Sequence, residues 1–244
     1  MERWTDEALV LGTLDYADAD RLVTLFTRTR GRLTAFAAGA RKSRRRFAGA
    51  LEPCTLLRAQ LVARRGSTLR LDGVDVVRAF HRLRDDLPRL GRALYAVELC
   101  RELVREEEPH PELFDAARTW LAELEEGAAG PTSLLAFELR ALALAGLMPR
   151  FDACCLCGGE PGPEPRFDPG HGGTVCLRCQ GRAPGAARVP PEHLLALSAL
   201  QAGARTPLPP AVRAAARGLL NAFIAHQLGR PLKGVEFLRQ LGVD

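Results

Sequence analysis

The stretch RLVTLFTRTRGRLTAFAA, residues 21–38, decides the fold of the N-terminal part of this chain. Two runs rich in apolar and β-branched residues, 21–27 and 33–38, flank the polar segment Thr29-Arg30-Gly31-Arg32. Such runs around a short connection containing glycine are typical of a β-hairpin. The sequence therefore predicts two antiparallel strands joined near Gly31.

Further strands are predicted on both sides of this hairpin. Residues 7–14 alternate loosely between apolar and polar, and the polar segment 15–20 turns the chain back. Downstream, residues 55–63 and 68–72 predict a second hairpin across residues 64–67. Five short strands in about 75 residues match the size of an OB-fold, a five-stranded barrel that binds oligonucleotides. The strand count alone favours a small SH3-like barrel almost equally.

From residue 80 the apolar residues recur at helical spacing. We therefore expect an α+β protein with an OB-fold domain over residues 1–79 and a helical domain over residues 80–244. The helices are predicted at residues 87–105, 112–124, 134–147, 192–202, 210–228 and 235–241.

Two cysteine pairs, Cys154-x-x-Cys157 and Cys176-x-x-Cys179, interrupt the helices within a loop of about residues 150–185. This spacing is typical of a zinc ribbon or knuckle. Four thiolates around one tetrahedral ion leave no open position, so we expect one structural Zn²⁺. The segment between the pairs is rich in proline and glycine and predicts a loop.

Other uses of these cysteines fit less well. Disulfides are disfavoured because the chain has no signal peptide and an odd number of cysteines, seven. A redox C-x-x-C motif does not explain the second pair, and a catalytic zinc normally has three protein ligands. Cys155 is expected to be a spare thiol, whereas Cys54 and Cys100 lie in apolar segments typical of a core.

The positive charge of the chain is concentrated at its N-terminal end. Residues 1–79 contain fifteen Arg and Lys against nine Asp and Glu, a net charge of +6, whereas residues 80–244 contain nineteen against twenty. A basic surplus confined to one domain indicates a surface that binds a polyanion. The preference for Arg over Lys is a compositional bias and does not explain this distribution.

The segment RKSRRR, residues 41–46, carries five of these charges and is expected to be a solvated loop that contacts phosphates. Arginines beside the predicted hairpin turns extend the candidate surface. With Phe36 and Phe47 as the nearby aromatic residues, recognition is expected to depend on the nucleic-acid backbone. The candidate nucleic-acid-binding residues are Arg41, Lys42, Arg44, Arg45, Arg46, Arg30, Arg32, Arg64 and Arg65.

The sequence lacks the motifs of the enzyme classes we considered, and we expect no catalytic residues. A P-loop is missing, and the zinc-deaminase pattern is incomplete because Ala153 and Val175, not proline, precede the cysteine pairs. The acidic run 106–108 is typical of a solvated helix end. The chain has no apolar stretch of 18 residues and no N-terminal signal core, so we expect a cytoplasmic, nucleoid-associated protein.

Several segments resemble, in order and spacing, the RecO family of DNA repair proteins. They are residues 39–43, 49–53, 108–114, 137–140, 146–149 leading into the first cysteine pair, and 228–233. The resemblance covers nearly the whole chain. One departure is Gly234, where the family usually has Ser after the lysine.

This resemblance implies an OB-fold followed by a helical domain with a zinc-binding insertion. It also implies a recombination mediator that binds single- and double-stranded DNA and anneals complementary strands. The implied partners are RecR, single-strand-binding protein and, indirectly, RecA. The residues alone indicate a zinc-stabilised DNA- or RNA-binding protein, or a scaffold whose basic loop docks an acidic protein.

Overall fold

The computed structural model describes residues 1–43, 45–66 and 68–242. The chain divides into two compact units, residues 1–128 and 129–244. The expected α+β class is confirmed, with strands first and helices after them. The proposed domain boundary after residue 79 marks the change from strands to helices. The first compact unit, however, also includes the first two helices. No helix among the described residues is both long and apolar enough to cross a membrane.

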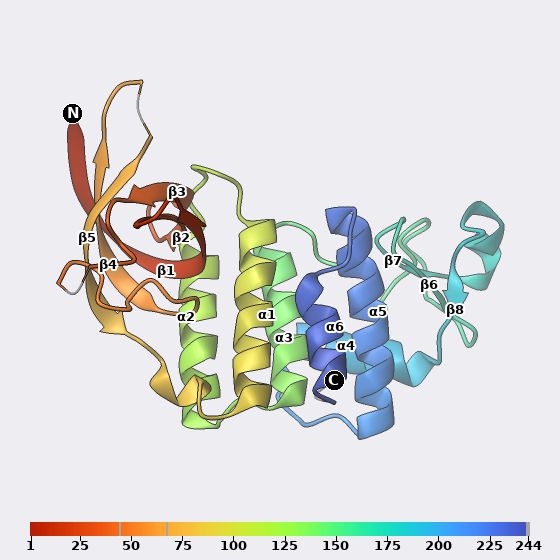
Figure 1. The fold of residues 1–244 in the computed structure, drawn as a ribbon. Coiled ribbons are helices and arrows are strands. Elements are labelled where there is room, and N and C mark those ends of the chain that lie inside the picture. The colour runs from red at the N-terminus through yellow and green to blue at the C-terminus, as the bar shows by residue number, and fades with distance from the viewer. Residues whose placement is uncertain (44, 67, 243–244) are drawn as a thin grey trace. The chain divides into compact units, whose positions relative to one another are not determined.

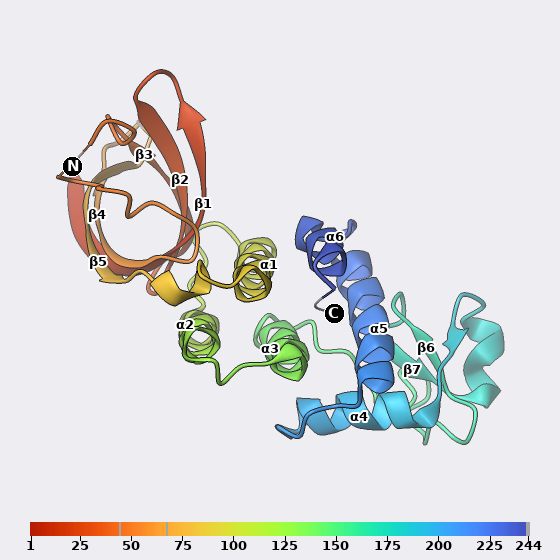
Figure 2. The same ribbon diagram turned by 60° about the horizontal axis from the view of Figure 1, so that its bottom comes forward.

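The first unit is built on a five-stranded closed barrel with the strand order β1-β2-β3-β5-β4. Figures 1 and 2 show this barrel from the side and from one end. β1 pairs with β4 over its residues 2–9 and with β2 over its residues 8–16, whereas β3 and β5 meet in a single parallel pair, Phe36 with Arg70. This topology agrees with the expected OB-fold. The strands are β1 (Glu2–Tyr16), β2 (Asp20–Thr27), β3 (Gly31–Ala37), β4 (Leu56–Ala63) and β5 (Arg70–Arg78).

β1 begins five residues earlier than the sequence predicts. Its polar start, Glu2–Asp6, pairs with the end of β4 through register partners such as Glu2 with Ala63. The strand also contains a register shift between Val10 and Gly12. A bulge of this kind changes which side chains face outward and increases the local twist. β5 likewise continues beyond the predicted residue 72.

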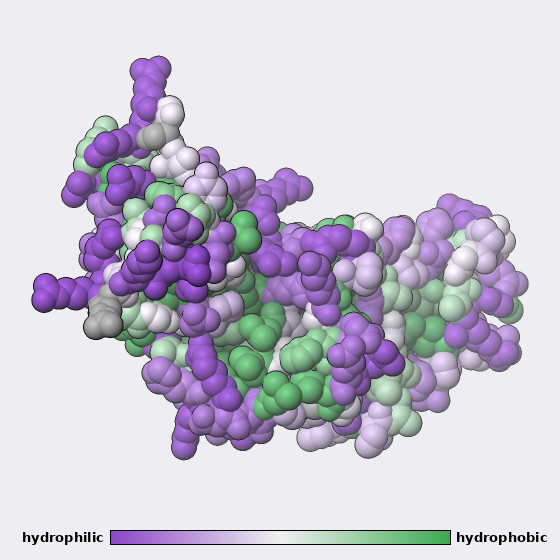
Figure 3. All heavy atoms as spheres, in the orientation of Figure 1, coloured by the Kyte–Doolittle hydropathy of each residue, from purple (hydrophilic) through white to green (hydrophobic). Residues whose placement is uncertain are grey.

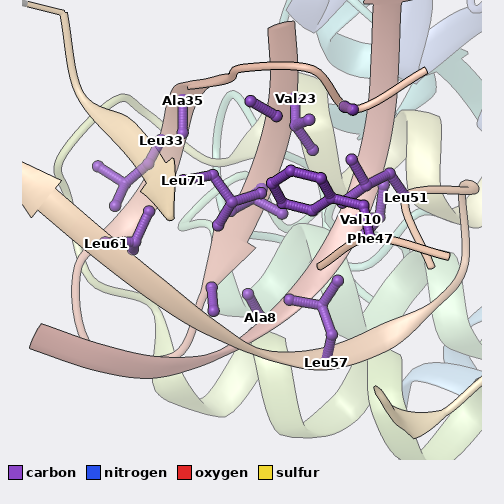
Figure 4. Close-up of a cluster of buried hydrophobic side chains, with 14 residues drawn as sticks. Ala8, Val10, Val23, Leu33, Ala35, Phe47, Leu51, Leu57, Leu61 and Leu71 are labelled. Atoms are coloured by element: carbon purple, nitrogen blue, oxygen red, sulfur yellow. The ribbon is translucent and has the colours of Figure 1, made fainter. Parts of the chain in front are cut away.

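The barrel is filled by aliphatic side chains around one aromatic ring, Phe47, which is 2 % exposed. Figure 4 shows this ring lying between Val10, Leu51 and Leu71. Phe47 comes from the segment between β3 and β4, outside the strands. The connection that carries the basic run is therefore anchored in the core of the barrel.

Two helices, α1 (Leu87–Leu103) and α2 (Pro111–Glu126), complete the first unit. Asp86 caps α1 by accepting a hydrogen bond from the backbone N–H of Arg89 at 2.8 Å. Gly127 ends α2 in the left-handed conformation. α2 packs on β2 through the edge-to-face pair of Phe26 and Phe114, whose ring centroids are 5.4 Å apart.

Within its described residues, 129–242, the second unit has four α-helices and a small sheet. The helices are α3 (Pro131–Leu144), α4 (Pro191–Gln201), α5 (Pro210–Leu228) and α6 (Lys233–Gln240), and each begins within a few residues of its predicted start. Glu138 of α3 and Arg217 of α5 form a buried ion pair. Removing either partner would leave the other charged group buried and uncompensated.

The cysteine-bearing segment is more ordered than the predicted loop. It forms a three-stranded sheet in the order β7-β6-β8, with β6 (Arg166–Asp168), β7 (Gly173–Val175) and β8 (Ala187–Arg188). Phe151 and Phe167 stack with centroids 5.8 Å apart, and Phe167 also contacts Phe223 of α5 at 6.4 Å. These three rings form a small apolar contact between the segment and α5, which the proline- and glycine-rich sequence did not predict.

Candidate functional site

The four predicted ligand cysteines meet at one point. The Sγ atoms of Cys154, Cys157, Cys176 and Cys179 all lie within 4.8 Å of one another, and all four thiols are free. The Sγ atoms of Cys157 and Cys176 are 3.8 Å apart. A tetrahedron with metal–sulfur bonds of about 2.3 Å has edges of about 3.8 Å, whereas a disulfide needs about 2.05 Å. The four thiols therefore fit a metal ion and do not fit two disulfides.

Tight turns aim the thiols at this point. The backbone N–H of Gly158 donates to the carbonyl of Cys154 at 2.8 Å, and Gly158 takes a φ of 71°. This left-handed conformation suits glycine best. In the second turn the N–H of Cys179 donates to the carbonyl of Cys176 at 3.0 Å, within a 3₁₀ turn over Leu177–Arg182. The two turns therefore bring their thiols to the same point through different backbone hydrogen bonds.

The thiols differ in how readily they ionise. Burial raises the pKa of Cys154, but hydrogen bonds from the backbone around Cys176 and Leu156 outweigh it and lower the pKa to about 6. Burial and the neighbouring cysteine sulfurs raise the pKa of Cys179 to about 12. Negative charge on one cysteine of the cluster, such as Cys154, therefore opposes ionisation of another, such as Cys179. A cation at the centre removes this opposition, because it is attracted to all four thiolates.

The other three cysteines lie outside this cluster. Cys155 is partly buried, its backbone N–H donates to the carbonyl of Thr174 at 2.8 Å, and burial raises its pKa. Cys54 and Cys100 are buried, and burial raises the pKa of each to about 12. The expectation that Cys54 and Cys100 are core residues is confirmed.

The basic run lies on a solvent-exposed connection between β3 and β4. Arg41, Lys42, Arg45 and Arg46 are exposed, and Arg44 lies outside the described residues. The backbone N–H of Arg41 donates to the carbonyl of Ala19 at 2.9 Å, which ties this basic loop to the β1–β2 turn. Arg46 donates to the carbonyl of Ala38 at 2.6 Å and lies over the ring of Phe47. Figure 3 shows mainly hydrophilic side chains over the barrel face in view.

The arginines at the hairpin turns lie at the other end of the barrel. Arg30 precedes β3, whereas the basic loop follows the end of that strand. Arg30 forms an ion pair with Glu2, which is the register partner of Ala63 at the end of β4. The exposed Arg64 and Arg65 follow Ala63 directly, and Arg32 donates to the carbonyl of Arg101 at 2.8 Å. The eight candidate residues that the structure describes therefore form two groups.

Aromatic residues of the barrel are placed differently from the sequence-based expectation. Phe47 is buried and presents no ring to a ligand. Tyr16, which the sequence analysis missed, is 53 % exposed and forms an edge-to-face pair with Phe36 at 5.9 Å. Leu14, 65 % exposed, is the register partner of Leu22, which is in turn the partner of Phe36. The bulge after Val10 produces this exposed apolar row, which no simple alternation of the sequence reveals.

Known proteins match the chain over its whole length. The family model described as "Recombination protein O N terminal" matches residues 1–80, and "Recombination protein O C terminal" matches residues 84–236. A protein named "DNA repair protein RecO" from Myxococcus xanthus is 64 % identical over 244 residues, covering 100 % of both chains. A protein of the same name from Anaeromyxobacter sp. strain Fw109-5 is 51 % identical, covering 99 % of this chain and 97 % of the relative.

A third protein of this name, from Geobacter sulfurreducens, is 41 % identical and covers 96 % of this chain and 97 % of the relative. The matched lengths take in the barrel, the helices and the cysteine-bearing segment. The chain belongs to the RecO family of DNA repair proteins.

Proposed function

We propose that this protein is a DNA-binding recombination mediator that binds single- and double-stranded DNA and anneals complementary strands. The observation that carries the proposal is the grouping of basic and aromatic side chains at one end of the barrel. There the exposed basic loop, with Arg41, Lys42, Arg45 and Arg46, is tied to the β1–β2 turn, directly after the exposed ring of Tyr16. Single-strand binding combines cations with aromatic rings, and here the cations lie beside the exposed Tyr16 and its partly buried partner Phe36.

This arrangement supports annealing without covalent chemistry. Each arginine or lysine that contacts a phosphate releases a condensed counterion, and the attached charge reduces repulsion between two nucleic-acid backbones. Aromatic rings hold bases by stacking while leaving their Watson–Crick edges able to pair. We therefore propose a non-enzymatic protein that needs no nucleotide. Arg44, Arg30, Arg32, Arg64 and Arg65 remain proposed members of the DNA-contacting surface.

We also propose that the metal in the four-cysteine cluster is a single structural Zn²⁺ held by Cys154, Cys157, Cys176 and Cys179. Four thiolate donors at tetrahedral spacing suit zinc and leave no coordination position for a substrate. When bound, the ion supplies cross-links between the two turns. The chain's own part is to place the four sulfurs, through the two turns and the small sheet behind them.

Membership of the RecO family supports the remaining parts of the proposal. We propose that an OB-fold domain over residues 1–79 and a helical domain over residues 80–244 act together. The proposed partners are RecR and single-strand-binding protein, and the proposed outcome is the loading of RecA onto coated single strands. The proposed location is the cytoplasm, in association with the nucleoid.

The decisive experiment measures annealing of two complementary labelled oligonucleotides by the full-length protein, without nucleotide, at low and moderate salt. We expect annealing well above the spontaneous rate, with the acceleration falling as salt rises. Measurable DNA binding without acceleration would contradict the annealing activity. Tighter binding to RNA than to DNA of the same sequence would favour the RNA-binding alternative.

A further inference from the structure

A cavity of about 480 Å³ lies at the mouth of the barrel, at the end opposite the basic loop. Its lining comes from the start of β1, the β2–β3 turn, the end of β4 and the loop that follows α1. This volume lies within the range of small-molecule sites, which are about 300–1,000 Å³ and often occupy barrel mouths.

The floor of the cavity is apolar and aromatic. Trp4, Leu33 and Leu69 line it, and all three belong to or pack against the barrel core. The guanidinium carbon of Arg30 lies 4.0 Å from the centroid of the Trp4 ring, within cation–π distance. Glu2 holds this guanidinium through an ion pair of 2.6 Å. The Trp4–Arg30 pair is therefore fixed in place before any ligand arrives.

The loop that follows α1 forms another part of the lining, and its backbone is held against the start of β3. The N–H of Glu107 donates to the carbonyl of Arg32 at 3.1 Å, and Glu107 has a left-handed φ of 59°. Gly31 lies so close to this loop that a Cβ atom on it would be 2.0 Å from the carbonyl oxygen of Glu108. Among the described residues, the carboxylate of Glu107 has no ion-pair partner. Glu107 lines the cavity, and its carboxylate can accept a hydrogen bond.

We propose that this mouth binds one unpaired nucleobase of a single-stranded nucleic acid, an inference that rests on the proposed function. A base offers a flat ring for the Trp4–Arg30 pair, because bases stack on aromatic rings and on arginine planes. An exocyclic amine on the base donates to the carboxylate of Glu107. The exposed Arg64 and Arg65, which follow the lining residue Ala63, are placed to contact the phosphates on either side.

The charges at the rim favour a base over a basic side chain of a protein partner. Two carboxylates, of Glu2 and Glu107, suit a ligand that donates hydrogen bonds, but Glu2 is already neutralised by Arg30. The exposed Arg64 and Arg65, which follow the lining residue Ala63, attract the phosphates of a nucleic acid. A nucleobase meets both requirements, because it donates a hydrogen bond to the carboxylate and is attached to phosphates that the arginines attract.

The carboxylate of Glu107 determines which nucleobase the mouth prefers. Cytosine presents an amine donor at its pairing edge, whereas thymine presents a carbonyl at the same place. Binding should therefore favour oligo-dC over oligo-dT. Duplex DNA, whose bases are stacked and paired, should not enter the mouth.

The test measures dissociation constants of the full-length protein for oligo-dC and oligo-dT of equal length. Glu107→Gln supplies an amide that both donates and accepts, so it should reduce the preference for oligo-dC about fivefold, the low end of the discrimination by one well-placed base contact. Glu106→Gln removes the same charge from a neighbour that does not line the cavity, and should keep the parental preference.

Tryptophan fluorescence provides a second readout. Trp120 lies buried in α2, so quenching by oligo-dC reports on Trp4, and Trp4→Phe should abolish it. The proposal is overturned if Glu107→Gln and Glu106→Gln show the same dC-to-dT ratio, or if oligo-dC leaves the fluorescence unchanged. Quenching by an arginine-rich peptide but not by oligonucleotides would identify a protein-docking site instead. A parent protein that binds no oligonucleotide would overturn the proposed function itself.

Discussion

Replacing Arg45 and Arg46 together by alanine tests whether the basic loop is the phosphate-binding element. Both side chains are exposed on the connection between β3 and β4. For single-stranded DNA, each lost phosphate contact reduces the slope of log K against log salt by about 0.7, so two contacts reduce it by about 1.4. Over the tenfold range from 1 M to 0.1 M salt, this change of slope amounts to about 25-fold weaker binding at 0.1 M, or about 1.9 kcal/mol.

The assay is fluorescence-anisotropy titration of a labelled oligonucleotide at several salt concentrations. The matched control is the double variant Arg188→Ala and Arg239→Ala. It removes the same charge from two side chains of the second unit that are 66 % and 68 % exposed. We expect the control to keep nearly the parental slope. An unchanged slope in the loop variant, or an equal reduction in both variants, would refute the assignment of the loop.

The remaining predictions concern the four-cysteine cluster, the barrel core and one ion pair. Cys157→Ser should lower the metal content and the thermal midpoint of the second unit, whereas Cys155→Ser should change neither; equal metal content in both variants would argue against the four-cysteine site. Phe47→Ala should cost about 3–5 kcal/mol in urea unfolding, because a buried ring is removed from the barrel core, and a cost below about 1 kcal/mol would contradict the anchoring of the loop. Arg28 lowers the pKa of Asp115 by hydrogen bonding, so this carboxylate stabilises the fold above its ordinary pKa of about 4 and the contribution disappears as the pH falls through the lower folded value. Asp115→Asn should therefore lower the unfolding midpoint at pH 7 but not in strong acid, and a loss that persists in acid would exclude the charge as its cause.

The elements that the sequence predicted well are those whose pattern is local. The hairpin of residues 21–38 has two apolar runs around a turn next to Gly31, and four of the described helices, α2 to α5, begin at a proline, which suits a first turn. The four-cysteine cluster was predictable because two C-x-x-C pairs have the spacing that a tetrahedral metal site requires. In each case a few neighbouring residues contain the information.

The parts that were missed depend on contacts between distant segments. The start of β1 is polar and becomes a strand only because β4 provides backbone partners. The strands of the cysteine-bearing segment have two or three residues each and depend on the Phe151–Phe167 stack. The separation of Arg30 from the basic loop, and the exposure of Tyr16, follow from the direction of β3 and from a bulge. Neither the separation of Arg30 nor the exposure of Tyr16 is visible as a pattern in the neighbouring sequence.

The single pair that closes the barrel gives this fold a seam. β3 and β5 meet only at Phe36 and Arg70, where the N–H of Phe36 donates to the carbonyl of Leu69 at 2.8 Å, while the other strand neighbours share long ladders. Local opening takes the path that breaks the fewest hydrogen bonds. Amide hydrogens of β3 along this seam should therefore exchange with solvent before those of β1 or β4. Phe36 also packs against the exposed ring of Tyr16. A strand of DNA bound across this pair would oppose separation of β3 from β5, and binding should therefore slow amide exchange along β3.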